Sequence, residues 1–122
     1  MKLFGLALSL FLCSSIAYAE DALAEVNAAR AARGLPPFQR DDGLMQAAYS
    51  CAQARASVLW DGHTRNDFAA LPAGAYARAT GCAAWSPSMG WGSCCTYENY
   101  SYAGAAYVMG RDGRRYMHLF VR

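Results

Sequence analysis

The stretch that decides the fold is Glu25–His63, which reads EVNAARAARGLPPFQRDDGLMQAAYSCAQARASVLWDGH. Small and apolar residues recur at helical spacing on both sides of Gly34–Phe38. Glycine readily ends a helix, and two successive prolines prevent it from continuing. The stretch therefore predicts two helices joined by an elbow, and His63 follows the second helix.

Polar residues at the expected helix starts support this assignment. Asp21 is suited to cap the first helix, and either Asp41 or Asp42 is suited to cap the second. Beyond His63, Asn66 or Asp67 is placed to cap one further short helical turn.

The second half of the chain predicts strands. Tyr76–Trp85, Cys95–Tyr100, Tyr102–Met109 and Arg114–Val121 have the composition of strands, and Gly110–Gly113 has that of a hairpin turn. In the last strand both faces are largely apolar, which is typical of a central strand. We therefore expect an α+β fold in which two N-terminal helices cover a small antiparallel sheet that ends in a β-hairpin.

The N-terminus has the pattern of a signal peptide. Lys2 precedes an apolar segment, Leu3–Leu12, and Ala17–Ala19 forms a small-x-small cleavage site before Glu20. The apolar segment is too short to span a bilayer. We expect residues 1–19 to be removed, residues 20–122 to form a single domain, and the protein to be secreted or periplasmic.

The remaining charges nearly cancel, since the only lysine is Lys2 and ten scattered arginines face nine acidic residues. Binding to nucleic acid needs a concentrated basic face, so we do not expect a nucleic-acid partner. We expect a monomer.

Four cysteines follow the expected cleavage site: Cys51, Cys82, Cys94 and Cys95. An even number in a small exported domain predicts two disulfides. A bond between the neighbours Cys94 and Cys95 would strain the peptide between them, so we expect Cys51 and Cys82 each to pair with one of these two.

Several motifs together resemble the CAP superfamily, which comprises cysteine-rich secretory proteins, antigen 5 and pathogenesis-related 1 proteins. The resemblance is carried by Glu25–Arg30, by the elbow Gly34–Phe38, by Asp41 and Leu44 with the small residues up to Cys51, by His63, and more loosely by the closing segment Ala103–Arg114. It implies a shortened, diverged bacterial member with an α-β-α sandwich.

The resemblance also implies a cleft, because members often carry two histidines and two glutamates that sometimes hold a divalent metal. His63 stands where the first histidine belongs. Cys82 stands where a glutamate is usual, and Trp85-Ser86-Pro87 is not followed by the usual helix and histidine. These departures imply that the cleft chemistry is largely lost.

Candidate cleft residues are His63, Glu98, Asn99 and His118. If His63, Glu98 and His118 converged, they could bind a divalent metal with one open position. A second candidate surface consists of aromatic residues, which suit recognition of a glycan or a protein: Trp85, Trp91, Tyr97, Tyr100 and Tyr102.

The favoured hypothesis is an exported, disulfide-stabilised, non-catalytic domain that acts by binding or structural support, with a protein, glycan or lipid as its ligand. One alternative is a metal-dependent hydrolase that uses His63, Glu98 and His118. Another is a secreted toxin or inhibitor, because small disulfide-bonded domains often serve in this way.

Overall fold

The computed structural model describes residues 14–85, 90–92 and 95–122, and side chains from Ala22 onward. Its elements follow one another as α1 (Ser14–Ala31), β1 (Gln39–Arg40), α2 (Asp42–Val58), the 3-10 turn η1 (Phe68–Ala70), β2 (Ala79–Trp85), β3 (Tyr102–Met109) and β4 (Arg115–Val121). The predicted strand Cys95–Tyr100 is wrong, because this segment consists of turns.

The four strands form one mixed sheet in the order β1-β3-β4-β2. β4 pairs antiparallel with both β2 and β3, whereas the short β1 pairs parallel with β3. The central position of β4 fits its sequence, because all seven of its residues are buried. The prediction of a purely antiparallel sheet is therefore wrong, because β1 pairs in parallel. The sequence did not predict β1, because it has only two residues.

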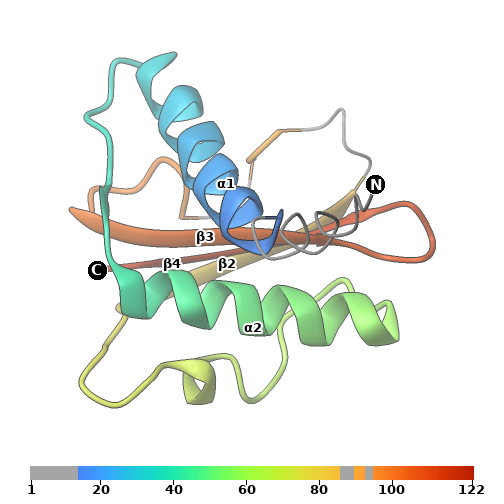
Figure 1. Ribbon diagram of the computed structural model, residues 1–122. Helices are drawn as coiled ribbons and strands as arrows, with labels where there is room; N and C mark the ends of the chain where they lie inside the picture. Colours follow the sequence, from blue (N-terminus) through green and yellow to red (C-terminus); the bar gives the residue numbers. More distant parts are fainter. Residues whose placement is uncertain (1–13, 86–89, 93–94) are drawn as a thin grey trace, which may run out of the picture.

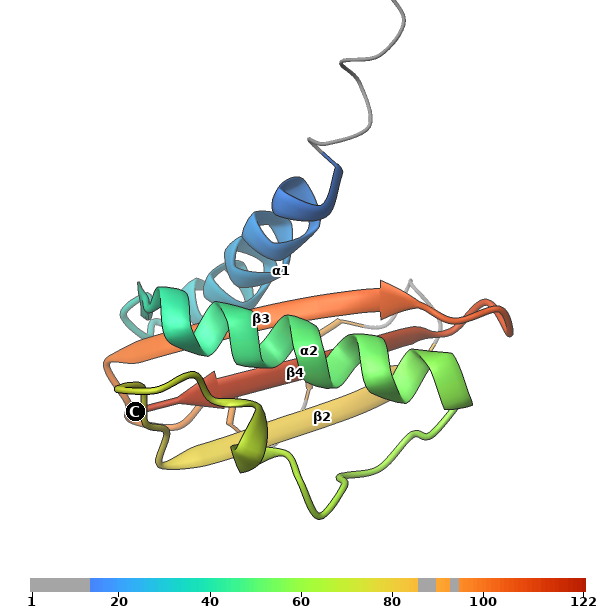
Figure 2. The same ribbon diagram turned by 60° about the horizontal axis from the view of Figure 1, so that its bottom comes forward.

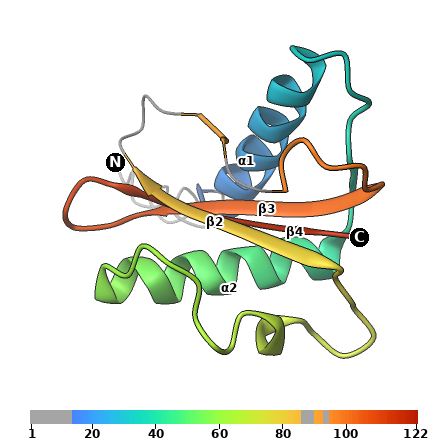
Figure 3. The same cartoon turned by 180° about the vertical axis from the view of Figure 1, so that it is seen from behind.

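The two helices lie on opposite sides of this sheet (Figure 1). The view from behind shows the same three layers, with η1 on the side of α2 (Figure 3). Each helix therefore covers a different face of the sheet. One face of β4 packs Met117, Leu119 and Val121 with α1, and the other packs Phe120 with α2.

The elbow between the helices is fixed by two side chains of α1. The Asn27 amide donates to the carbonyl of Phe38 at 3.1 Å and accepts from its N–H at 2.8 Å. The buried Arg30 guanidinium donates to the carbonyl oxygen of Pro36 at 2.8 Å. Gly34, at φ 73°, provides the left-handed residue that the end of α1 requires.

Helix α2 crosses β3 with its backbone in direct contact. Asp41 caps α2, as expected, by accepting from the N–H of Leu44 at 3.0 Å. A Cβ added at Gly104 of β3 would lie 2.0 Å from the carbonyl carbon of Leu44, so only glycine fits at this crossing. The approach fixes how α2 lies over β3 and β4 (Figure 2).

The predicted disulfides are also wrong for the cysteines that the structure describes. No disulfide joins Cys51, Cys82 and Cys95, the cysteines that the structure describes, and Cys94 lies outside the described residues. Cys51 lies on the buried face of α2, and Cys95 lies in the core cluster on the α1 side of the sheet. The sheet therefore separates these two cysteines. That separation excludes a disulfide between Cys51 and Cys95, one of the two pairings expected for Cys51.

The signal-peptide prediction falls mainly outside the described residues. Residues 1–13 are not described, and the predicted cleavage bond after Ala19 lies within α1, which begins before the predicted cap Asp21. Within the described part of the chain, none of the helices has the length and apolar character needed to cross a membrane.

The contact at Gly104 makes a direct prediction about stability. Gly104→Ala should lower the free energy of unfolding by more than about 4 kcal/mol, because the backbones of β3 and α2 must separate. Denaturant unfolding measures this change. Gly92→Ala is the matched control, since its added Cβ meets no atom of the described residues within 4 Å, and it should stay within about 0.5 kcal/mol of wild type. Equal stability of the two variants would contradict the crossing geometry.

Candidate functional site

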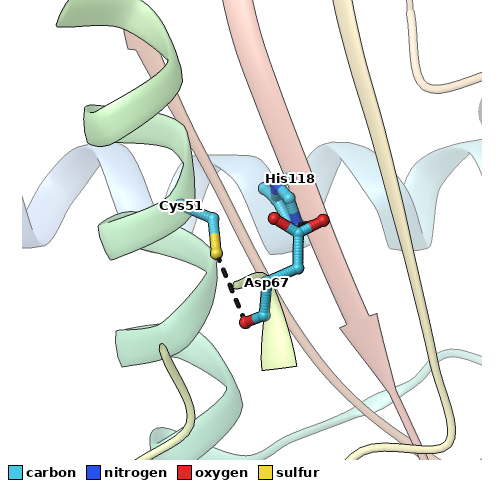
Figure 4. Close-up of side chains that lie close together, drawn as sticks. All are labelled: Cys51, Asp67 and His118. Atoms are coloured by element: carbon cyan, nitrogen blue, oxygen red, sulfur yellow. Dashed lines mark hydrogen bonds and ion pairs between the residues drawn. The ribbon is translucent and has the colours of Figure 1, made fainter. Parts of the chain in front are cut away.

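The candidate site is a buried cluster between α2, the segment before η1, and β4. Cys51 comes from α2, Asp67 precedes η1, and His118 lies in the middle of β4 (Figure 4). One ligand atom from each of the three side chains lies within 4.8 Å of the other two. All three residues are buried, and His118 has no exposed surface.

Arg55 positions the segment that carries the site. Its buried guanidinium donates to the carbonyl oxygens of Asp61 and Gly62, at 3.0 Å each. It also donates to Met117 of β4 at 2.8 Å and to Ala83 of β2 at 3.2 Å. This single side chain therefore ties the chain after α2 to the sheet, just ahead of His63.

The Asp67 carboxylate is the centre of the hydrogen bonds at the site. It lies 2.6 Å from Nδ1 of His63, and it accepts from the Thr64 hydroxyl at 2.8 Å and from the Thr64 N–H at 3.3 Å. Burial alone would raise the pKa of Asp67, but the hydrogen bonds from His63 and Thr64 outweigh burial and lower it. Asp67 is therefore held as a buried carboxylate.

His118 is a neutral imidazole with no hydrogen-bond partner among the described residues. Both of its ring nitrogens are buried without a hydrogen bond, and Nε2 lies 3.7 Å from the Asp67 carboxylate, within ion-pair distance but beyond hydrogen-bond distance. Burial lowers the pKa of His118 from 6.5 to about 3, against the opposing effect of Asp67. A buried polar group without a hydrogen bond lowers the free energy of unfolding by about 1–3 kcal/mol. A ligand that bonded to a ring nitrogen of His118 would remove this cost.

Cys51 completes the cluster as a protonated thiol. Its Sγ donates to the carbonyl oxygen of Asp67 at 3.7 Å. Burial, followed by the charge of Asp67, raises the pKa of Cys51 to about 12. Without a partner that stabilises the thiolate, Cys51 is a poor nucleophile at neutral pH.

Both predicted histidines, His63 and His118, lie at this site, and the predicted acidic ligand, Glu98, does not. The rings of His63 and His118 have centroids 6.0 Å apart. Glu98 lies instead where its carbonyl oxygen accepts from Arg30 of α1 at 2.9 Å. Asn99 lines a different pocket, together with Arg78.

The predicted binding aromatics divide between two pockets. Tyr100 and Tyr102 line the pocket of about 340 Å³ that contains Arg78. Trp85, Trp91 and Tyr97 line one of about 350 Å³ beside α1. The structure therefore gives no single aromatic surface built from all five residues.

Sequence reasoning missed Asp67 as a site residue. It was expected only as a helix cap, yet it makes no side-chain capping bond to η1. The spacing of His63 and Asp67, four residues apart, was the available signal. Cys82 was also missed as a neighbour: it pairs with His118 across β2 and β4, and its charge contributes to the raised pKa of Cys51.

Comparisons of this sequence and structure with protein families, with curated proteins and with solved structures gave no match. Membership of the CAP superfamily, export and the nature of any ligand therefore stay predictions.

The state of His118 predicts a pH dependence of stability. Because its pKa is lowered from 6.5 to about 3 in the folded chain, the unfolded chain binds the extra proton first as the pH falls. The contribution of neutral His118 to the free energy of unfolding should be fully present above about pH 6.5. Below that pH it should be lost progressively, by up to about 1.4 kcal/mol per pH unit.

Denaturant unfolding between pH 7.5 and 4.5, in the presence of a chelator, tests this dependence. His118→Gln should flatten the profile in this range, where the carboxylate of Asp67 is still ionised. An unchanged slope in His118→Gln would show that other groups cause the loss of stability.

Proposed function

We propose that this protein is a metal-binding domain whose Cys51, Asp67 and His118 hold a divalent ion of the zinc class. The observation that carries the proposal is the buried His118 imidazole, which is neutral and unpaired beside a carboxylate and a thiol. A neutral imidazole, a carboxylate and a thiol that can lose its proton are the donors that Zn²⁺ takes in proteins.

The spacing of the donors fits one ion. Three atoms no more than 4.8 Å apart all lie within about 2.8 Å of a common centre, and zinc–ligand distances are roughly 2.0–2.3 Å. Each donor would therefore move by less than about 1 Å. Mg²⁺ and Ca²⁺ prefer oxygen donors alone, so the mixed set favours zinc over both.

The proposal replaces the predicted ligand set His63, Glu98 and His118. His63 is not one of the three ligands here; it contacts Asp67 from outside. Such outer contacts orient a ligand and tune its basicity. We retain binding as the primary role from the sequence analysis, but without disulfide stabilisation.

Titration calorimetry of the reduced protein with Zn²⁺ and, separately, with Mg²⁺ tests the metal site. Zn²⁺ should bind at one ion per chain and Mg²⁺ should not. His118→Gln and Cys51→Ser should each weaken Zn²⁺ by more than the roughly 10–100-fold that loss of an outer contact costs. Cys95→Ser, a buried cysteine on the other side of the sheet, is the matched control.

Proton release provides a second readout that does not depend on affinity. Because the pKa of Cys51 is raised to about 12, coordination must displace its proton. Calorimetry in buffers of different ionisation enthalpy counts the protons released when Zn²⁺ binds. Cys51→Ser should release about one proton fewer per Zn²⁺ than the wild-type protein does. Zinc binding that is equal in wild type, His118→Gln and Cys51→Ser would refute the site.

A second candidate function, metal-dependent hydrolysis, is favoured by the placement of His63. Its side chain is 48 % exposed and lines a pocket of about 810 Å³, while its Nδ1 is held by buried Asp67. An imidazole fixed at Nδ1 presents Nε2 as a proton acceptor. A zinc ion supplies a Lewis acid and lowers the pKa of the water that it binds.

Hydrolysis of chromogenic ester and amide substrates by the zinc-loaded chain separates the two functions. If His63 is a general base, His63→Ala should reduce turnover by about 10²–10⁴-fold. Its zinc affinity should fall by no more than about 100-fold. Zinc binding without turnover leaves the binding function and rejects the hydrolase.

A further inference from the structure

The pocket beside the metal cluster has the size of a small-molecule site. It occupies about 810 Å³ between the second half of α2 and the segment that follows it, within the roughly 300–1,000 Å³ usual for ligand pockets. Cys51 and His63 both line it, so the pocket adjoins the cluster. Figure 2 shows the segment after α2 turning back at the end of the helix and running alongside it to η1.

The edge of the pocket is apolar and uncovered in the described part of the chain. Val58 is 69 % exposed and Trp60 is 54 % exposed, and both line the pocket. The Trp60 indole N–H donates to the carbonyl oxygen of His63 at 3.1 Å, which holds the ring beside that histidine. A fixed indole with an exposed surface suits stacking of a planar ring.

The pocket also contains one cation that no described residue neutralises. Arg65 lines it and is exposed, and it has no hydrogen bond or ion pair with any residue that the structure describes. Arg55, the other arginine in the lining, is bonded to backbone carbonyls instead. Nearby Asp61 is paired with Arg114, at 3.5 Å.

We propose that this pocket binds a small carboxylate that carries an aromatic group. The ring lies against Trp60 and Val58, and the negative charge is matched by Arg65. A metal ion at Cys51, Asp67 and His118 adds positive charge at the edge of the pocket, so zinc strengthens binding. Only this gain with zinc rests on the proposed function; the pocket contacts themselves do not.

Calorimetry with 3-phenylpropionate tests the proposal on the full chain, with and without Zn²⁺. Binding should be measurable in both states and tighter with Zn²⁺. Propionate lacks the ring and 3-phenylpropanol lacks the charge, so each should bind at least about tenfold more weakly, the loss expected when a stacked ring or a charged hydrogen bond is removed.

Matched variants locate the site. Arg65→Gln and Trp60→Ala should each weaken 3-phenylpropionate by about tenfold. Arg78→Gln and Tyr76→Ala are the controls, because Arg78 is an exposed arginine and Tyr76 is 55 % exposed, and both line another pocket. Arg65→Gln removes no hydrogen bond or ion pair between described residues, so it tests the site even if Trp60→Ala fails to fold.

The two proposals fail in different ways. Zinc binding with no binding of 3-phenylpropionate, or equal loss in Arg65→Gln and Arg78→Gln, would overturn the pocket assignment and leave the metal site. Binding of 3-phenylpropionate that Zn²⁺ does not change would support the pocket and reject its coupling to the ion.

Discussion

The site depends on the hydrogen bonds of Arg55. Its guanidinium reaches two carbonyls of the segment after α2 and one carbonyl on each of β2 and β4. A buried charge is stable only when its donors are satisfied, and here the backbone of three segments satisfies them. The segment carrying His63 and Asp67 is thereby held over β4, where His118 lies. Arg55 thereby helps to set the spacing between Asp67 of the segment and His118 of the strand.

A second buried arginine acts in the same way on the opposite face. Arg30 of α1 donates to the carbonyl oxygens of Pro36, Thr96 and Glu98. It joins the elbow to the turns that precede β3. Each helix therefore contributes one buried arginine, Arg30 from α1 and Arg55 from α2. The hydrogen bonds of each arginine to backbone carbonyls join segments that are distant in the sequence. The chain is rich in alanine, and these arginines fix connections that small apolar side chains could not specify.

The free state of the Cys51 thiol decides the chemistry open to the protein. A disulfide would have removed Cys51 as a donor, whereas the free thiol lies beside Asp67 and His118. The raised pKa of Cys51 argues against a role as a nucleophile, and the same buried position is compatible with a thiolate held by an ion. The pocket next to the cluster then connects the proposed ion site to a surface with exposed aromatic and cationic groups. Binding and hydrolysis are alternative uses of this one arrangement.

By itself, the sequence determined the local structure wherever periodicity and capping were strong. The elbow at Gly34–Phe38, the cap at Asp41 and the buried central strand β4 all follow from patterns within a few residues. It also singled out His63 and His118. Only the tertiary structure decided that α1 and α2 take opposite faces, that β1 joins in parallel, and that Asp67 rather than Glu98 meets the histidines. The reason is physical: these outcomes depend on contacts between residues far apart in the chain, such as Gly104 with α2 and Arg55 with Met117, and no local pattern encodes them.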